Sequence, residues 1–182
     1  MRFTLLDRIV AIAPGQRIEA IKNLAAAEEY LADHFPLFPV MPGVLMLEAM
    51  TQAGSWLIRA SENFAHSIVV LKEARNVKYA DFVRPGQTLL VTAEIMSQTA
   101  TETTLKAQGT VDGKVNVSGR LILTRYNLAD ENKLHADTDE RVRAKMRDFF
   151  ALLFPAAGVM GVVASNGAVR TIIPAEGQPI TV

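Results

Sequence analysis

The most informative segment of this 182-residue sequence reads His34-Phe-Pro-Leu-Phe-Pro-Val-Met-Pro-Gly-Val-Leu-Met-Leu-Glu48-Ala-Met-Thr-Gln52. Its first part, up to Gly43, contains three prolines, which remove backbone donors and exclude a regular helix. We expect a stiff, irregular loop there. Residues 44–60 favour a helix and are apolar on nearly every face. Such a helix is buried on all sides, so the sequence predicts a central helix that the rest of the fold surrounds.

Strand-forming patterns lie on both sides of this helix. Residues 8–13 and 16–22 are rich in β-branched side chains, and Pro14-Gly15 between them predicts a hairpin. After the helix, the patterns predict strands at 67–71, 76–83, 88–97, 102–111 and 114–126, with a tight turn at Asp112-Gly113. One buried helix followed by antiparallel strands predicts an α+β fold in which a curled sheet wraps the helix.

Composition excludes several classes of function. Lys and Arg together number 19, as do Asp and Glu, and this zero net charge argues against a nucleic-acid binder. The absence of cysteine excludes thiol nucleophiles, disulfides and Cys-based metal sites. The histidines, at 34, 66 and 135, are far apart, so no metal site is expected.

Neither a targeting segment nor a membrane span is expected. Charged residues interrupt the apolar residues of the N-terminus. The longest apolar run, residues 44–58, contains Glu48 and is too short to cross a bilayer. We therefore expect a cytoplasmic protein.

The sequence changes character after Tyr126. Residues 127–139 are polar and are expected to form a linker. Residues 139–154 predict an amphipathic helix that Pro155 ends, because apolar side chains recur at helical spacing. These side chains are Val142, Met146, Phe149, Phe150 and Leu153. Residues 156–182 show no assignable pattern.

Two side chains of the quoted segment suit acid–base chemistry. His34 provides an imidazole on a rigid loop, and Glu48 lies in the second turn of the predicted helix among Val, Leu and Met. Because desolvation disfavours the charged form, we expect the pKa of Glu48 to be raised. An acid with a raised pKa beside a neutral imidazole is typical of catalysis at neutral pH.

Neighbouring groups are suited to support this pair. Gln52 follows Glu48 by one helical turn, where it either holds the carboxyl group or satisfies a buried backbone group. The free N–H groups of Gly43 and Val44, at the positive end of the helix, are candidates to bind a developing oxyanion. The sequence has no Gly-x-Ser-x-Gly elbow, phosphate-binding glycine loop or dinucleotide fingerprint, so no cofactor is expected.

At these residues the sequence resembles a known family, the hotdog-fold 3-hydroxyacyl-[acyl-carrier-protein] dehydratases of bacterial fatty-acid synthesis. The resemblance runs from about Phe3 to Tyr126 and implies a hotdog domain over residues 1–126 with an extension over 127–182. Glu48 implies the branch that dehydrates without isomerising. The motifs that carry the resemblance are the His34–Gln52 segment, Leu5-Leu-Asp-Arg8, Pro14-Gly15, Ile18–Asn23, Val77-Lys-Tyr and Arg84-Pro-Gly86. Asp33 and Leu37 depart from it, since the family usually has glycine at both positions.

The resemblance also implies a reaction and partners. Water would leave across C2–C3 of a 3-hydroxyacyl thioester, with His34 as base, Glu48 as acid and the Gly43 N–H on the thioester carbonyl. The acyl group would be carried by the phosphopantetheine of acyl carrier protein. In this family the His and Glu of one site belong to different protomers, so a homodimer or a larger assembly such as a hexamer is implied.

Two other interpretations remain open at this point. One is a hotdog thioesterase, which would hydrolyse the thioester with an activated water. The other is a non-catalytic hotdog subunit that only binds acyl chains, although such subunits typically lack one of the two site residues. Four basic residues, Lys72, Arg75, Lys78 and Arg84, either meet an acidic carrier protein or form an ordinary solvated face.

Overall fold

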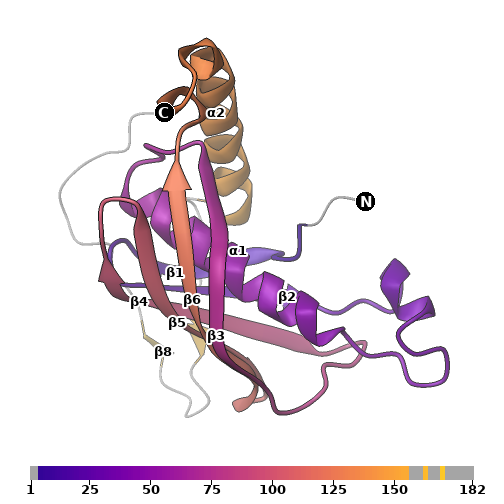
Figure 1. The fold of residues 1–182 in the computed structure, drawn as a ribbon. Helices are drawn as coiled ribbons and strands as arrows, with labels where there is room; N and C mark the ends of the chain where they lie inside the picture. The colour runs from indigo at the N-terminus through magenta and orange to yellow at the C-terminus, as the bar shows by residue number, and fades with distance from the viewer. Residues whose placement is uncertain (1–3, 156–161, 164–168, 171–182) are drawn as a thin grey trace.

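A six-stranded antiparallel sheet curls around helix α1 (Gly43–Ser61) in the structure, a computed structural model that describes residues 4–155, 162–163 and 169–170 (Figure 1). The order of the strands is β1-β2-β4-β5-β6-β3, which leaves β1 and β3 at the edges. Their bounds are β1 Arg8–Ala13, β2 Arg17–Asn23, β3 Ile68–Tyr79, β4 Thr88–Gln98, β5 Glu102–Val111 and β6 Lys114–Tyr126. The predicted α+β fold with a wrapped central helix is confirmed.

The core lies between α1 and the concave face of the sheet. Along β5, buried and more exposed residues alternate, as the two-residue period of a strand requires. Gly54 allows α1 to approach β5 closely, because a Cβ atom at this position would lie 2.4 Å from Cδ1 of Leu105. Methionines that the sequence places in and before the helix, Met41, Met46 and Met50, are all buried in this core.

Strand β3 differs from the expectation of two separate strands at 67–71 and 76–83. It runs without interruption from Ile68 to Tyr79 and pairs with β6. The register shifts between Arg75 and Lys78, and Asn76 has a φ of 52°. This irregularity is a bulge within one strand, so the two expected strands are one.

The segment after β6, which was expected to be a polar linker, contains short helical turns. It folds into two short 3-10 helices, η2 (Leu128–Asp130) and η3 (Lys133–His135), and then into α2 (Ala136–Leu153). The predicted amphipathic helix therefore exists, but it begins three residues earlier than residue 139. Residues 156–182 lie outside the described part of the chain, apart from a two-stranded pair, β7 (Val162–Val163) and β8 (Val169–Arg170).

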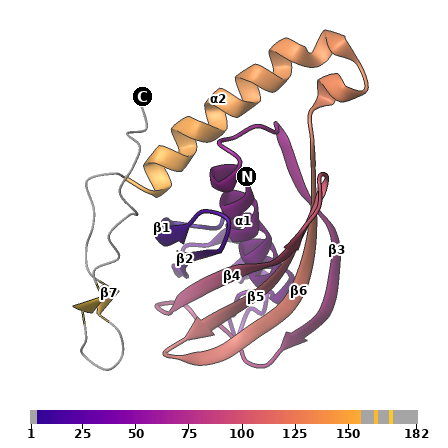
Figure 2. The same ribbon diagram turned by 90° about the vertical axis from the view of Figure 1, so that its left-hand side faces the viewer.

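Helix α2 packs across the C-terminal end of α1 (Figure 2). The ring of Trp56 lies 5.7 Å from that of Phe149 and 5.9 Å from that of Phe150, measured between centroids. Phe150 also meets Phe64 edge-on at 5.6 Å, and Leu153 is buried. The apolar stripe predicted for this helix thus contacts the body of the same chain. Among the described residues, no helix is long and apolar enough to cross a membrane.

A buried carboxylate, Asp139, anchors the start of α2. It accepts hydrogen bonds from the Ser67 hydroxyl and from the backbone N–H groups of Leu128 and Ala129, at 3.0 and 2.8 Å for the latter two. Burial by itself would raise the pKa of Asp139, but these hydrogen bonds and the nearby Arg143 outweigh it and bring the pKa below its usual value. The folded state therefore favours the ionised carboxylate.

Replacing Asp139 by asparagine is expected to lower the melting temperature at neutral pH. A depressed pKa in the folded state stabilises the protein above the unfolded pKa of about 4, and this stabilisation is lost as the pH falls through the folded pKa. The difference in melting temperature between the two proteins should therefore shrink as the pH is lowered below about 4. Asp148→Asn, at an exposed position of the same helix, is the matched control. Equal melting of Asp139→Asn and the unmodified protein at pH 7 would contradict this role.

Candidate active site

The loop that carries His34 projects from the body between β2 and α1 (Figure 1). It follows the short 3-10 helix η1 (Glu29–Ala32), where the N–H of His34 donates to the carbonyl of Tyr30 at 3.1 Å. The N–H of Val40 donates back to the carbonyl of His34, also at 3.1 Å. The segment is therefore an irregular loop, as its prolines predict. Backbone hydrogen bonds within the loop hold its two ends together.

The imidazole of His34 has one of its nitrogens occupied by the backbone. Nδ1 lies 3.1 Å from the carbonyl oxygen of Val40. A carbonyl only accepts, so this contact assigns the proton of the neutral ring to Nδ1. Nε2 then carries the free lone pair. The half-buried ring, which also stacks on Phe35 at 4.3 Å, is arranged to act as a base through Nε2.

The carboxyl group of Glu48 is held by a hydrogen-bonded chain that reaches the N-terminal segment. Gln52 donates from Nε2 to Oε1 of Glu48 at 2.9 Å. The amide oxygen of Gln52 accepts from the backbone N–H of Leu5, also at 2.9 Å. Gln52 therefore fulfils both of the roles considered from the sequence, since it holds Glu48 and satisfies a backbone donor. Glu48 is half-buried, and the described residues give it no ion pair.

The N-terminus of α1, the helix that carries Glu48 and Gln52, has backbone N–H groups for which the described residues show no acceptor. The first N–H groups of any helix have no intrahelical acceptor, and no side chain caps this helix at Pro42. Gly43 and Val44 therefore present N–H groups at the positive end of the helix dipole. The ring of Tyr79 lies against Gly43, where an added Cβ atom would be 3.0 Å from the ring. A larger residue at this position would require the Tyr79 ring to move by a few tenths of an ångström.

The candidate residues are only partly brought together in one chain. Glu48, Gln52 and Leu5 are connected, and Gly43 opens the same helix. In the part of the chain that the structure describes, no hydrogen bond joins His34 to Glu48. The described residues contain no group of three or more potential metal ligands. Sequence reasoning missed the Val40 carbonyl, whose contact depends on the conformation of an irregular loop, and the Tyr79 ring, whose contact depends on tertiary structure.

The fold and these side chains define a hotdog protein equipped for acid–base chemistry. Residues 1–124 match the family model of the FabA-like domain, so the chain belongs to the FabA-like family. Among curated relatives, the 3-hydroxyacyl-[acyl-carrier-protein] dehydratase FabZ of Ruminiclostridium cellulolyticum is 34% identical over 119 residues, which cover 65% of this chain and 84% of the relative. FabZ of Lactococcus lactis subsp. cremoris (strain MG1363) is 39% identical over 119 residues, covering 65% and 82%.

Solved structures support the hotdog architecture. The dehydratase heterocomplex ApeI:P from Xenorhabdus doucetiae matches with a TM-score of 0.58 and 18% identity, covering 74% of this chain and 90% of that one. A mutant thioesterase from Pseudomonas aeruginosa matches with a TM-score of 0.53 and 15% identity, covering 65% and 80%. Similarity at these identities concerns the fold alone.

Proposed function

We propose that this chain dehydrates a 3-hydroxyacyl thioester on acyl carrier protein to the trans-2-enoyl thioester, a step of fatty-acid synthesis. The observation that carries the proposal is the presence of His34 and Glu48, each held by hydrogen bonds, within the segment that matches the FabA-like domain. The FabZ relatives support the choice of reaction and of carrier. We assign the activity to residues 1–126, and the expected cytoplasmic location stays part of the proposal.

The geometry suggests how each group takes part. Nε2 of His34 removes the C2 proton, while the thioester carbonyl accepts hydrogen bonds from the N–H groups of Gly43 and Val44 as it gains negative charge. Glu48 gives its proton to the C3 hydroxyl, which leaves as water. Because Oε1 of Glu48 accepts from Gln52, the transferable proton lies on Oε2. After the product leaves, exchange with solvent restores the proton to Glu48 and the free lone pair to His34.

We further propose that two copies of the chain share each site. His34 and Glu48 are not hydrogen-bonded to each other within the described part of one chain. In a dimer, the loop of one copy would place its His34 beside Glu48 of the other copy. Large apolar side chains around the loop are open to solvent in the single chain, with Leu37 fully exposed and Val44 66% exposed. Exposed apolar surface beside a functional loop is typical of an interface.

The test is to add the purified full-length chain to 3-hydroxyacyl thioesters of graded chain length, on acyl carrier protein and on coenzyme A. We expect absorbance from the conjugated enoyl thioester to appear without release of free thiol. Thiol release at the rate of substrate loss would instead identify a thioesterase. Absence of both products, despite binding of the acyl thioester, would identify a non-catalytic subunit.

A further inference from the structure

Three side chains form a stack beside the loop that carries His34. The rings of Phe38 and Phe82 meet edge to face, with centroids 5.4 Å apart and planes at 88°. The guanidinium carbon of Arg84 lies 5.3 Å from the centroid of the Phe38 ring. Both geometries are attractive, since a ring edge and a cation each favour the electron-rich face of an aromatic ring. We call Phe38, Phe82 and Arg84 the clasp.

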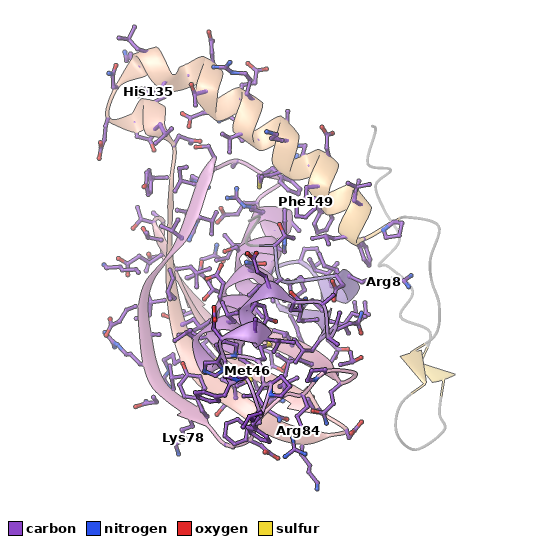
Figure 3. All side chains as sticks on the ribbon, turned by 90° about the vertical axis from the view of Figure 1, so that its right-hand side faces the viewer. Arg8, Met46, Lys78, Arg84, His135 and Phe149 are labelled. Carbon is purple, nitrogen blue, oxygen red and sulfur yellow. The ribbon has the colours of Figure 1, made fainter. Side chains whose placement is uncertain are left out.

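The clasp connects two segments that are distant in the sequence. Phe38 belongs to the His34 loop, whereas Phe82 and Arg84 lie in the connection between β3 and β4. Figure 3 shows Arg84 at the end of the molecule remote from Phe149 of α2. One backbone hydrogen bond runs beside the clasp, from the N–H of Met41 to the carbonyl of Val83 at 2.9 Å. Both kinds of contact fix the His34 loop against the β3–β4 connection.

The β3–β4 connection is itself held in place. The carbonyl of Phe82 accepts from the Asn116 side chain of β6 at 3.0 Å, and Val83 is fully buried. Within the His34 loop, Phe35 and Phe38 exchange backbone hydrogen bonds at 3.2 and 2.9 Å. A shift of Phe38 would therefore be transmitted to Phe35 and to the neighbouring His34. The connection acts as the fixed support, and the loop is the part that it supports.

Exposure indicates that the clasp contributes little to the core. Phe38 is 42% exposed and Phe82 is 51% exposed, so the two rings bury much less surface than a core pair.

Of the other basic residues near β3, Lys72 and Arg75 form ion pairs with Glu102 and Glu73. The described contacts of the Arg84 guanidinium are with the Phe38 ring rather than with a carboxylate.

We propose that Phe82 and Arg84 are positioning residues, which act through Phe38 to hold His34 at the angle needed to remove the substrate proton. This inference rests on the proposed function, because it needs His34 to be the base. A misplacement of a reacting group by about 1 Å can cost on the order of 10²-fold in rate. Neither residue needs to touch the substrate to influence turnover.

The experiment compares Phe82→Ala, Arg84→Ala and Arg84→Lys in the full-length chain, using a 3-hydroxybutyryl pantetheine thioester as substrate. This substrate lacks the carrier protein, so any contact of Arg84 with the carrier is removed from the measurement. We expect kcat to fall about tenfold in both alanine variants, with KM changed less than about twofold. Arg84→Lys should recover most of the activity because the cation remains. Arg141→Ala, at an exposed position of α2, is the control and should be unchanged.

A double-mutant cycle with Phe38→Ala tests whether both residues act through Phe38. In that background, neither Arg84→Ala nor Phe82→Ala should cause a further loss, because the ring that both residues contact is absent. Losses that multiply, or a loss confined to KM, would overturn the proposal and indicate direct contact between Arg84 and the substrate. Circular dichroism checks that each variant is folded. If Phe82→Ala does not fold, the Arg84 variants still test the proposal, because they alter an exposed side chain.

The NMR signals of the His34 ring provide a readout that a loss of stability alone would not change. In Arg84→Ala, we expect the Nδ1 and Nε2 shifts to move toward a mixture of tautomers as the bond to Val40 loosens. Unchanged ring shifts and unchanged kcat, with His34→Ala inactive, would refute the clasp but leave the proposed function intact. An active His34→Ala variant would instead refute the proposed function itself.

Discussion

Replacing His34 by alanine or Glu48 by glutamine is expected to lower kcat by about 10²–10⁴-fold, the range that a general acid or base contributes. His34→Ala removes the lone pair that takes the C2 proton. Glu48→Gln keeps the size of the side chain and a carbonyl oxygen for Gln52 to donate to, but has no proton to give the leaving hydroxyl. The measurement is the rate of enoyl thioester formation under saturating substrate.

Both variants should fold, since neither residue belongs to the buried core. His135→Ala, which changes an exposed histidine before α2, is the control for the first variant. Glu140→Gln, at an exposed position of α2, is the control for the second. Near-full turnover by folded His34→Ala or Glu48→Gln would remove that residue from catalysis.

Mixing the two inactive variants is expected to restore activity if each site combines His34 of one chain with Glu48 of another. In a heterodimer of His34→Ala and Glu48→Gln, one site then has both native residues and the other has neither. Activity should therefore return to at most about half of the unmodified level per heterodimer, a rise of at least about tenfold over either variant alone. The mixture is unfolded, refolded and assayed, and native mass spectrometry counts the heterodimers.

Each variant refolded alone is the control for recovery during the procedure, and neither should gain activity. Heterodimers that form but stay inactive would mean that both residues of a site come from one chain. The hydrogen bonds of the single chain are compatible with restored activity, because they join His34 to Val40 and Glu48 to Gln52 but not His34 to Glu48.

Local sequence signals were sufficient for most of the fold. The prolines before Gly43 and the continuous apolar run after it predict a loop and a buried helix, and both are confirmed. β5 and β6 begin and end at the predicted residues. The turn between them is where it was expected, because Asp112 and Gly113 adopt the positive φ values, 50° and 79°, that a tight hairpin requires. These features depend on residues that are neighbours in the chain.

The local sequence pattern missed two features of the fold. Asp139 ends the stretch expected to be a polar linker, but it is buried and accepts hydrogen bonds from Ser67 and from two backbone N–H groups near the start of α2. Asn76 was expected to begin a separate strand, but pairing with β6 continues on both sides of it, so it lies at a bulge within β3. Neither partner set is visible in the local pattern.

The same distinction applies to the candidate site. The four-residue spacing of Glu48 and Gln52 is enough to predict their contact, which the structure contains. The contacts of Phe38 with Phe82 and Arg84 join segments that only the folded chain brings together. The sequence could identify the chemical groups of the site but not the contacts that orient them.

Deuterium uptake tests most directly the claim that His34 and Glu48 perform a reversible dehydration. The full-length chain is incubated in D2O with 3-hydroxyacyl carrier protein, and the acyl group is analysed by mass spectrometry and NMR. Loss of water and its re-addition should place a single deuterium at C2 of the recovered 3-hydroxyacyl group, while the thioester stays intact. His34→Ala and Glu48→Gln should slow this uptake strongly. Cleavage of the thioester without deuterium at C2, or equal uptake with His34→Ala, would contradict the assignment.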